Sequence, residues 1–303
     1  MKAIGIDIGG TTVKGSLIDD YRNIHKQVSI PTAISEGREG ILSSLTRTID
    51  QVLEGEVGIS GIGIGTAGRV NVKSGEVVYS TDNLPGWQGI NLRDFITNTY
   101  SLPVVVDNDA NAALVGELWS MGKPYKSITM LTLGTGVGGA NKIDGEIVRG
   151  HNWNGGEWGH VILYPNGRDC NCGKKGCIEQ YLSGKALLRI ANEQSNHSIF
   201  ENGDEIFEAF VKGDKEIKPV VDVYLNDLVL VLYNLSIGLD SEAVIIGGGV
   251  IDSQDKWWHL LKQKLAVQEV HIDVLPASLG NKAGMIGAVK LLFDVLQKGE
   301  EKV

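Results

Sequence analysis

Carboxylate and amide side chains gather directly after a run of β-branched residues. The three valines that open Val104–Glu117 suit the interior of a sheet, and Asp107, Asn108, Asp109 and Asn111 follow them. The alanines and the leucine that come next predict a helix, which one of these polar residues caps. A cap uses only one or two of the four side chains. Because ligands bind at the carboxyl edge of an α/β sheet, the surplus favours a catalytic or binding site over a cap alone.

The three cysteines of the chain lie close together, at Cys170, Cys172 and Cys177, and His160 lies ten residues before the first of them. Three thiolates and one imidazole complete a tetrahedral zinc site of the structural type. Three unrelated thiols are the alternative, and their tight spacing argues against it. A redox role fits less well, because the cluster lacks a C-x-x-C pair. The sequence therefore predicts one zinc ion held by His160 and the three cysteines.

Two glycine-rich turns, Gly9-Gly10-Thr11-Thr12 and Gly134-Thr135-Gly136, each follow an apolar strand-like run. Glycine lets a ligand approach the backbone, and the N–H dipoles of such a turn favour anions, so both turns are candidates for phosphate binding. Tight turns without a ligand are the alternative for either one alone, and their repetition favours phosphate. Gly134–Gly139 also matches the dinucleotide pattern G-x-G-x-x-G, but strand and turn residues follow where that pattern needs a helix.

The elements that must position these residues form two similar series. Ile4–Ile18 predicts a strand, a turn and a second strand, which make a β-hairpin, and Ile128–Gly139 repeats this opening later in the chain. Between them, Gly37–Leu53 has the apolar period of a helix, and Ile59–Gly65 reads as a buried strand of alternating glycine and isoleucine. We therefore expect an α/β protein of two lobes related by duplication, with a cleft between them.

The smaller lobe is expected at residues 1–121, joined by a C-terminal helix at 284–303, and the larger lobe at 122–283, with the zinc loop in it. The second half of the chain predicts a strand that ends in glycines, Ala243–Val250. It also predicts five helices, at Gly184–Glu193, Glu201–Val211, Pro219–Leu239, Lys256–Val267 and Gly284–Leu296.

Composition narrows the class of partner. The chain has 303 residues, 42% of them hydrophobic, and a formal net charge of −9. This charge argues against nucleic acid or an anionic membrane as a partner, since either needs a basic face. Asp222, Asn226 and Asp227 interrupt the apolar run Val220–Leu239, which therefore fits a buried helix better than a membrane span. No signal peptide is visible, because Asp7 interrupts the first apolar run, and we expect a cytoplasmic protein.

Five motifs, read in order, resemble the ROK family of sugar kinases and related repressors. They span nearly the whole chain, and the segment C-x-C-G-x-x-G-C-x-E after G-E-x-G-H is highly specific. The motifs are Asp7-Ile8-Gly9-Gly10-Thr11, Asn108-Asp109-Ala110-Asn111-Ala112, Leu133-Gly134-Thr135-Gly136, Gly156-Glu157-Trp158-Gly159-His160 and Cys170–Glu179. The resemblance implies the two-lobed actin-like, hexokinase-like fold of the ribonuclease H-like class, with ATP and a sugar meeting in the cleft.

The resemblance also implies roles for individual residues. Asp109 matches the base that accepts the proton of the sugar hydroxyl, and Asp7 would lie near the magnesium ion. Zinc would have a positional role, because it would fix the loop that presents Glu157 and Glu179. Its loss would therefore weaken the binding of the sugar rather than the binding of ATP. The expected sugar contacts are Asn108, Asp109, Glu157, His160 and Glu179, with Gly68 and Asn83 as further candidates. The expected ATP contacts are Asp7, Gly9, Gly10, Thr11, Thr12, Lys14, Gly134, Thr135, Gly136, Gly247, Gly248 and Gly249.

The implied reaction is transfer of the γ-phosphate of ATP, with Mg²⁺, to a hexose hydroxyl, with O6 as the expected acceptor. A carboxylate must orient that hydroxyl and take its proton, because an alcohol is a poor nucleophile. Glucose and N-acetylhexosamines such as N-acetylmannosamine are the main candidates, with fructose and β-glucosides as alternatives. Ala67-Gly68 stands where many glucokinases of the family have proline and glycine, which weakens the case for glucose.

Two other classes of function are weighed against the kinase. A sugar-responsive repressor of the same family carries a DNA-binding segment ahead of the core, and the phosphate hairpin starting at Ile4 leaves no room for one. An actin-like filament would not need Glu157, Glu179 and the zinc set. Both arguments favour a kinase, and because family members are commonly dimers or tetramers, a homodimer or homotetramer is expected.

Overall fold

The computed structural model describes residues 1–196 and 199–300 of the chain. It divides into two compact units. Among the described residues, the first consists of Met1–Pro124, Arg149–Asn154 and residues 281–300, and the second of Tyr125–Val148 and those within Gly155–Gly280. These bounds differ from the expected lobes chiefly in the short segment Arg149–Asn154, which packs with the first unit.

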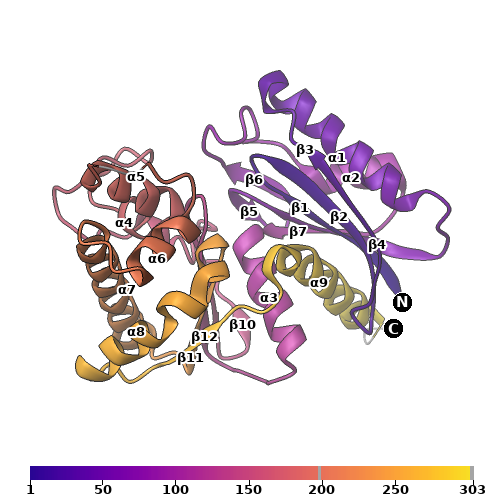
Figure 1. Ribbon diagram of the computed structural model, residues 1–303. Helices are drawn as coiled ribbons and strands as arrows, with labels where there is room; N and C mark the ends of the chain where they lie inside the picture. The colour runs from indigo at the N-terminus through magenta and orange to yellow at the C-terminus, as the bar shows by residue number, and fades with distance from the viewer. Residues whose placement is uncertain (197–198, 301–303) are drawn as a thin grey trace. The chain divides into compact units, whose positions relative to one another are not determined.

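The first unit is built on a five-stranded sheet with the order β3-β2-β1-β4-β7 (Figure 1). The predicted hairpin is present: β2 pairs antiparallel with β1 and with β3, whereas β4 and β7 run parallel to β1. A small sheet of two antiparallel strands, β5 and β6, accompanies it. The strands are β1 Lys2–Ile8, β2 Thr12–Asp19, β3 Ile24–Pro31, β4 Ile59–Thr66, β5 Arg69–Asn71, β6 Glu76–Tyr79 and β7 Val104–Asn108.

Apolar side chains, among them those of helix α1, cover one face of this sheet. Helix α1 (Gly37–Leu53) has the predicted bounds, and its apolar stripe joins the same core cluster as Ile62 and Ile64 of β4. Ile41 and Leu45 of the helix are fully buried there. The isoleucines of the alternating Gly/Ile strand therefore belong to the same hydrophobic core as α1 in the first unit.

On the other face, the backbone of helix α9 lies directly against the sheet. Helix α9 (Ala283–Glu300) approaches β4 so closely that a Cβ at Gly63 would lie 2.0 Å from the carbonyl oxygen of Ala288. The same helix crosses α3 (Asp109–Met121), where a Cβ at Gly287 would lie 1.7 Å from the carbonyl oxygen of Ala112. The glycines of β4 and α9 thus permit two close backbone contacts. The unit is completed by α2 (Leu92–Tyr100) and the short turn η1 (Ile34–Glu36).

The second unit repeats this plan with the strand order β10-β9-β8-β11-β12. β9 pairs antiparallel with β8 and β10, and β11 and β12 continue parallel to β8. The matching order and directions are the structural counterpart of the predicted duplication. The strands are β8 Ile128–Leu133, β9 Val137–Ile143, β10 Glu146–Ile147, β11 Ala243–Gly247 and β12 Asp273–Pro276.

The helices predicted for the second half of the chain are all present, with ends that differ by a few residues. The strand predicted at Ala243–Val250 is shorter, because Gly248 has a φ of +85° and ends it. A helical turn follows instead. The helices are α4 Glu179–Leu182, α5 Gly184–Gln194, α6 Gly203–Val211, α7 Ile217–Leu239 and α8 Gln254–Val267, and the turns are η2 Trp158–His160, η3 Gly249–Ser253 and η4 Gly280–Lys282.

Within residues 1–196 and 199–300, α7 is the one helix that is long and apolar enough to cross a membrane. Its residues Val221, Leu228 and Leu232 are fully buried in the core of the second unit. Asp227 of the same helix is also buried, and its carboxylate accepts a hydrogen bond from the hydroxyl of Tyr164. The burial agrees with the prediction that the polar residues of this run mark a core helix.

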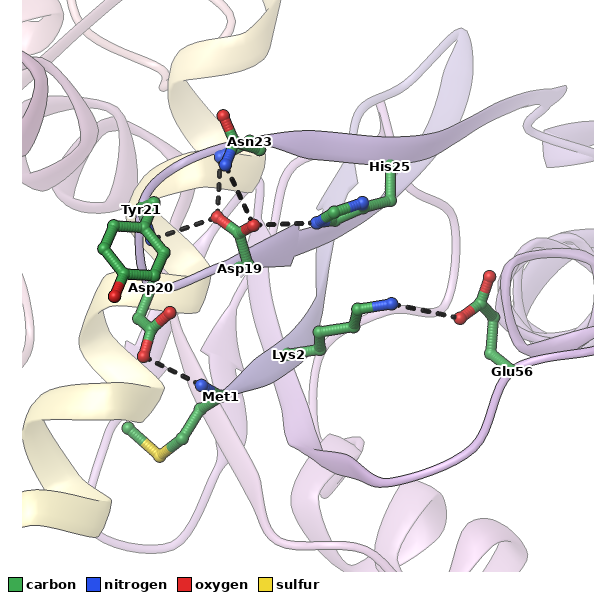
Figure 2. A network of polar contacts seen from close by, with 8 residues as sticks. All are labelled: Met1, Lys2, Asp19, Asp20, Tyr21, Asn23, His25 and Glu56. Atoms are coloured by element: carbon green, nitrogen blue, oxygen red, sulfur yellow. Dashed lines mark hydrogen bonds and ion pairs between the residues drawn. The ribbon is translucent and has the colours of Figure 1, made fainter.

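A single carboxylate holds the turn between β2 and β3 (Figure 2). Asp19 accepts hydrogen bonds from the backbone N–H groups of Tyr21 and Asn23 and from the Asn23 amide. It also lies 2.8 Å from Nε2 of His25. Although desolvation opposes ionisation, these hydrogen bonds lower the pKa of Asp19 to about 2. The network fixes the turn that anchors the N-terminal hairpin.

Candidate active site

The carboxyl ends of three parallel strands meet at one edge of the first sheet. Ile8 of β1 is in register with Thr66 of β4, and Thr66 is in register with Asn108 of β7. The residues that follow are the Gly9 turn, Gly68 and Asp109, all of them predicted site residues. The register therefore brings these three stretches to one edge, where α/β sheets bind ligands.

Asn108 and Asp109 occupy the start of α3. The side-chain oxygen of Asn108 accepts from the backbone N–H groups of Ala110 and Asn111, which makes Asn108 the N-cap. Its amide N–H₂ donates to Oδ1 of Asp109 at 2.9 Å and to the carbonyl oxygen of Gly68 at 3.0 Å. Asn108 thus caps the helix and orients both neighbouring site residues.

A buried ion pair supports this helix start. Asp107 is 2% exposed and accepts from Nε of Arg149 at 3.0 Å and from the Asn111 side chain at 3.0 Å. It also accepts from the N–H of Asn108. Two of the four polar residues in the starting motif, Asp107 and Asn111, are therefore structural, since their contacts lie inside the fold. Arg149 belongs to the segment that packs with the first unit, and this pair explains why it does.

The first glycine turn is closed and braced by hydrogen bonds. The Gly9 N–H donates to the carbonyl oxygen of Thr12 at 3.0 Å. Thr32, just after β3, donates its N–H to the carbonyl of Thr11 at 2.9 Å and its hydroxyl to the carbonyl of Gly9 at 2.7 Å. The carbonyl oxygen of Asn83 lies 3.2 Å from where a Cβ at Gly10 would stand. Asn83, predicted for the sugar, thus has its backbone beside the turn predicted for phosphate.

Asp7 precedes this turn on β1 and pairs in the strand register with Lys14. Burial raises the pKa of the Asp7 carboxyl, and the nearby Lys14 charge opposes the shift in part. Lys14 Nζ also donates to Asn281 at 3.2 Å. Gly284, near the start of α9, leaves room for the carboxyl, because a Cβ there would lie 3.2 Å from its carbon. A partly buried carboxyl of this kind is suited to a cation.

The glycines of the second unit gather at the equivalent edge of its sheet. The Gly134 N–H donates to the carbonyl of Gly136 at 3.0 Å, which closes the predicted turn. Gly248 packs on the end of β8, where a Cβ would lie 2.5 Å from the Leu133 backbone. The N–H nitrogen of Gly249 lies 4.0 Å from the Cβ position of Gly134. The predicted phosphate and adenosine glycines are therefore neighbours.

Glu179 lies against this second turn. Its Oε2 accepts a hydrogen bond from the Val137 N–H at 3.0 Å. A Cβ at Gly136 would lie only 2.3 Å from the same oxygen, so glycine is what admits the carboxylate. The sequence had placed Glu179 on the sugar side, and nothing local in it signalled this contact with the turn.

The predicted zinc ligands converge. The ligand atoms of His160, Cys170, Cys172 and Cys177 all lie within 4.8 Å of one another. Cys172 Sγ and Cys177 Sγ are 3.6 Å apart, and Cys170 Sγ lies 3.7 Å from His160 Nδ1. Tetrahedral zinc with bonds of about 2.3 Å to sulfur needs ligand separations of about 3.8 Å. The donor set and its spacing fit zinc.

The chemistry of the thiols agrees with a cation at this point. Burial raises the pKa of the Cys177 thiol to about 12, with hydrogen bonds to the neighbouring thiols adding to the shift. Three thiolates at this spacing repel one another, and a divalent ion removes the repulsion. His160 turns Nδ1 toward the sulfur atoms, so Nε2 is the ring nitrogen left for another partner.

Backbone contacts tie the two arms of the zinc loop together. The Ile178 N–H donates to the carbonyl of Val161 at 2.9 Å, and the Leu163 N–H donates to the carbonyl of Gly176 at 2.8 Å. Gly176 has a φ of +79°, and a Cβ there would lie 1.6 Å from the Tyr164 carbonyl oxygen. The loop therefore requires glycine at this position.

The predicted site residues fall in both units. Those of the first unit are Asp7, Gly9, Gly10, Thr11, Thr12, Lys14, Gly68, Asn83, Asn108 and Asp109. Those of the second unit are Gly134, Thr135, Gly136, Glu157, His160, Cys170, Cys172, Cys177, Glu179, Gly247, Gly248 and Gly249. Thr32 and Arg149 were not predicted, because each supports a site residue from a segment far away in sequence.

Comparison with known proteins supports a single family. The ROK family model matches residues 3–295. A glucokinase of Halalkalibacterium halodurans is 33% identical over 98% of both chains. An N-acetyl-D-glucosamine kinase of Yersinia pseudotuberculosis is 30% identical over 95% of this chain and 97% of its own. A solved ROK family glucokinase from Streptomyces griseus, in complex with glucose and AMPPNP, is 32% identical, with a TM-score of 0.84 over 96% of this chain and 99% of that one.

Two α/β units with one strand order, each with a glycine turn after its first strand, define the actin-like, hexokinase-like fold. The chain belongs to the ROK family. The resemblance drawn from the five sequence motifs is confirmed.

Proposed function

We propose that this member of the ROK family is an ATP-dependent sugar kinase that transfers the γ-phosphate of ATP to a hexose hydroxyl, with O6 as the acceptor. The observation that carries the proposal is the register of the first sheet, which brings Asp109, Gly68 and the Gly9 turn to one edge. A carboxylate base beside a phosphate-binding turn is what phosphoryl transfer to an alcohol needs. The sugar kinases that are 30–33% identical over nearly their whole length support the same class.

Asp109 is the proposed general base. The Asn108 amide holds one oxygen of its carboxylate at 2.9 Å, which restricts the orientation of the group. An oriented carboxylate can accept the proton of the hydroxyl as that oxygen attacks phosphorus. Asn108 contributes through this hydrogen bond and through its bond to the Gly68 carbonyl. Gly68, Asn83, Glu157, His160 and Glu179 complete the proposed sugar contacts.

The glycine turns are the proposed phosphate contacts. Gly9, Gly10, Thr11 and Thr12 supply N–H and hydroxyl groups in the first unit, and Gly134, Thr135 and Gly136 do so in the second. Magnesium enters with ATP and neutralises phosphate charge when bound. Asp7 and Lys14 are proposed beside that charge, because desolvation raises the pKa of the Asp7 carboxyl and a bound cation would stabilise its ionised form. Gly247, Gly248 and Gly249 are proposed next to the adenosine.

Zinc is the proposed occupant of the cysteine cluster. His160, Cys170, Cys172 and Cys177 fill four tetrahedral positions, which leaves none for a reacting water and makes the site structural. We place the enzyme in the cytoplasm, because its three cysteines are grouped as a metal site rather than paired in the disulfides typical of secreted proteins. A homodimer or homotetramer is proposed, and sedimentation equilibrium of the purified chain measures it.

Glucose is the first proposed acceptor, and an N-acetylhexosamine is the second because one relative is an N-acetyl-D-glucosamine kinase. The test is a coupled assay of ADP release with MgATP and a panel of sugars: glucose, N-acetylglucosamine, N-acetylmannosamine, fructose and a β-glucoside. We expect one hexose to give a kcat/KM at least about tenfold above the rest, equivalent to about 1.4 kcal/mol of discrimination. No ADP release with any hexose would contradict the kinase. If the 6-deoxy analogue of the best sugar, added to the panel, releases ADP as fast as that sugar does, O6 is not the acceptor.

A further inference from the structure

One segment reaches the second glycine turn from the zinc loop. Glu179 is the first residue of α4 and follows Cys177 by two positions. Its carboxylate accepts from the N–H of Val137, the residue directly after the Gly134–Gly136 turn, at 3.0 Å. A hydrogen bond to a charged acceptor is stronger than one between neutral groups. The turn is therefore held by a side chain whose own position depends on the last cysteine.

The other arm of the zinc loop touches the same residue. A Cβ at Gly159, next to His160, would lie 2.1 Å from the carbonyl oxygen of Val137. The side-chain N–H of Trp158 donates to Asn141 of β9 at 2.9 Å. Val137 is thus held through its N–H by one arm and packed at its carbonyl by the other.

A third contact fixes the opposite side of the turn. The Gly184 N–H, at the start of α5, donates to the carbonyl of Gly134 at 2.7 Å. Glu179 and Gly184 are joined by the single helical turn α4. Both sides of the glycine turn are consequently bound by the segment that leaves the zinc loop.

We propose that Glu179 is a positioning residue for nucleotide binding, through which the zinc loop holds the Gly134–Gly136 turn in the conformation that receives phosphate. The proposal rests on the assignment of this turn to ATP. It differs from the expectation that zinc acts on the sugar alone, because one oxygen of Glu179, which is also a proposed sugar contact, accepts from the residue that follows the turn. Loss of the metal then weakens nucleotide binding as well as sugar binding.

The first test is nucleotide affinity without any sugar. Calorimetry measures the Kd of AMPPNP with Mg²⁺ for the wild type, Glu179→Ala, Glu179→Gln and a surface control, Glu208→Ala. We expect Glu179→Ala to raise the Kd about tenfold to a hundredfold, as loss of one hydrogen bond to a charged group does. Glu179→Gln keeps an acceptor oxygen and should stay within about threefold of the wild type. All of these variants should retain zinc.

The outcomes separate this inference from the function it rests on. Absence of AMPPNP binding to the wild type contradicts the kinase itself. Equal AMPPNP affinity in the wild type and in Glu179→Ala, with weaker sugar binding in that variant, assigns Glu179 to the sugar alone and overturns the positioning role. If AMPPNP binding is weakened by the same factor in Glu179→Gln and Glu179→Ala, the positioning role is also overturned, because the glutamine amide preserves the acceptor oxygen.

A double-mutant cycle tests the contact itself. Gly136 is not among the glycines with positive φ, so alanine is compatible with its backbone, but its Cβ would collide with Glu179 Oε2. Gly136→Ala should therefore raise the Kd of AMPPNP in the wild type and raise it by a smaller factor in the Glu179→Ala background. Additive effects would overturn the proposed contact, since independent sites add.

Metal removal provides the remaining measurement. Cys172→Ser should lose zinc, as metal analysis measures, and bind AMPPNP at least as weakly as Glu179→Ala does. Circular dichroism checks that the variant is folded, and chelator-treated wild type serves as a second zinc-free sample. A folded, zinc-free protein that binds AMPPNP with wild-type affinity would overturn the link between the metal loop and the turn.

Discussion

The β1–β2 turn and the β8–β9 turn occupy equivalent places in sheets of the same strand order, but different groups hold them. Thr32 donates an N–H and a hydroxyl to carbonyls of the first turn, and both groups are neutral. Glu179 accepts an N–H from the residue after the second turn, and it comes from the segment that follows the cysteines. The first support is local to its own sheet, whereas the second depends on a loop with the geometry of a zinc site.

The outer parallel strands differ in the same manner. In the first sheet, β7 is followed by Asp109, and in the second sheet the equivalent strand β12 is followed by Ala277. The two sheets therefore place their turns and strand ends at equivalent positions, because the same hydrogen-bonded strand order sets those positions in both. The chemistry at that place depends on the few residues that come after the strand.

The largest expected effect concerns the acid that only the first sheet carries. Asp109→Asn should lower kcat by roughly 10²–10⁴, because the amide cannot accept the proton of the sugar hydroxyl. Sugar binding, measured by calorimetry, should survive better than turnover. Asp255→Asn, an exposed acid on α8, is the matched control. Near-normal kcat in Asp109→Asn on the best sugar of the panel would remove Asp109 from the mechanism.

The next effect concerns the support that only the second turn has. Cys172→Ser should reduce bound zinc from one per chain toward none and lower the Tm by about 10 °C, which corresponds to about 3–5 kcal/mol at 2–4 °C per kcal/mol. Metal analysis and thermal unfolding measure the two quantities. Lys174→Ala, an exposed residue of the same loop, should change neither. If the serine variant keeps a full complement of zinc, the assignment of the ligands is wrong.

A smaller effect is expected from the neutral brace of the first turn. Thr32→Val removes the hydroxyl that donates to the Gly9 carbonyl and keeps the size of the side chain. The turn therefore loses about 1 kcal/mol of stabilisation in its binding conformation. The Kd of AMPPNP should rise roughly fivefold. That factor should be the same in zinc-loaded and zinc-depleted protein, because the hydrogen bond from Thr32 to Gly9 does not involve the metal loop. Thr99→Val, on the exposed side of α2, is the control, and a zinc-dependent factor would erase the contrast between the turns.

The smallest effect lies at the far end of the first hairpin, at Asp19. Its pKa of about 2 is below its ordinary value near 4, so the ionised carboxylate stabilises the fold above pH 4 and this contribution is lost as the pH falls toward 2. Wild type should therefore exceed Asp19→Asn in Tm at pH 5 by a small amount, and the difference should shrink between pH 4 and 2. A difference that is constant across this range would mean that the charge contributes nothing. AMPPNP affinity should be unchanged, since this network is separate from the glycine turn.

Several elements could be predicted from the sequence because their determinants are local. The bounds of α1 follow from its apolar period, and the hairpin follows from two strand-like runs around Gly9 and Gly10. Asn108 was among the residues from which a cap was expected, and it is the cap. The strand at Ala243 was predicted too long, because nothing in its composition shows that Gly248 turns to a positive φ. The four candidate zinc ligands were identified by type and spacing alone, and the structure brings them together.

The amino-acid sequence by itself determined the family, the two hairpin openings and the candidate residues, since these depend on residue type and on neighbours a few positions apart. Tertiary structure decided which polar groups meet. Arg149 binds Asp107, and Glu179 accepts from Val137, each across a separation of 42 residues. No periodicity or motif carries such pairings, because they arise only when the strands have taken their register and the loops close over their ends.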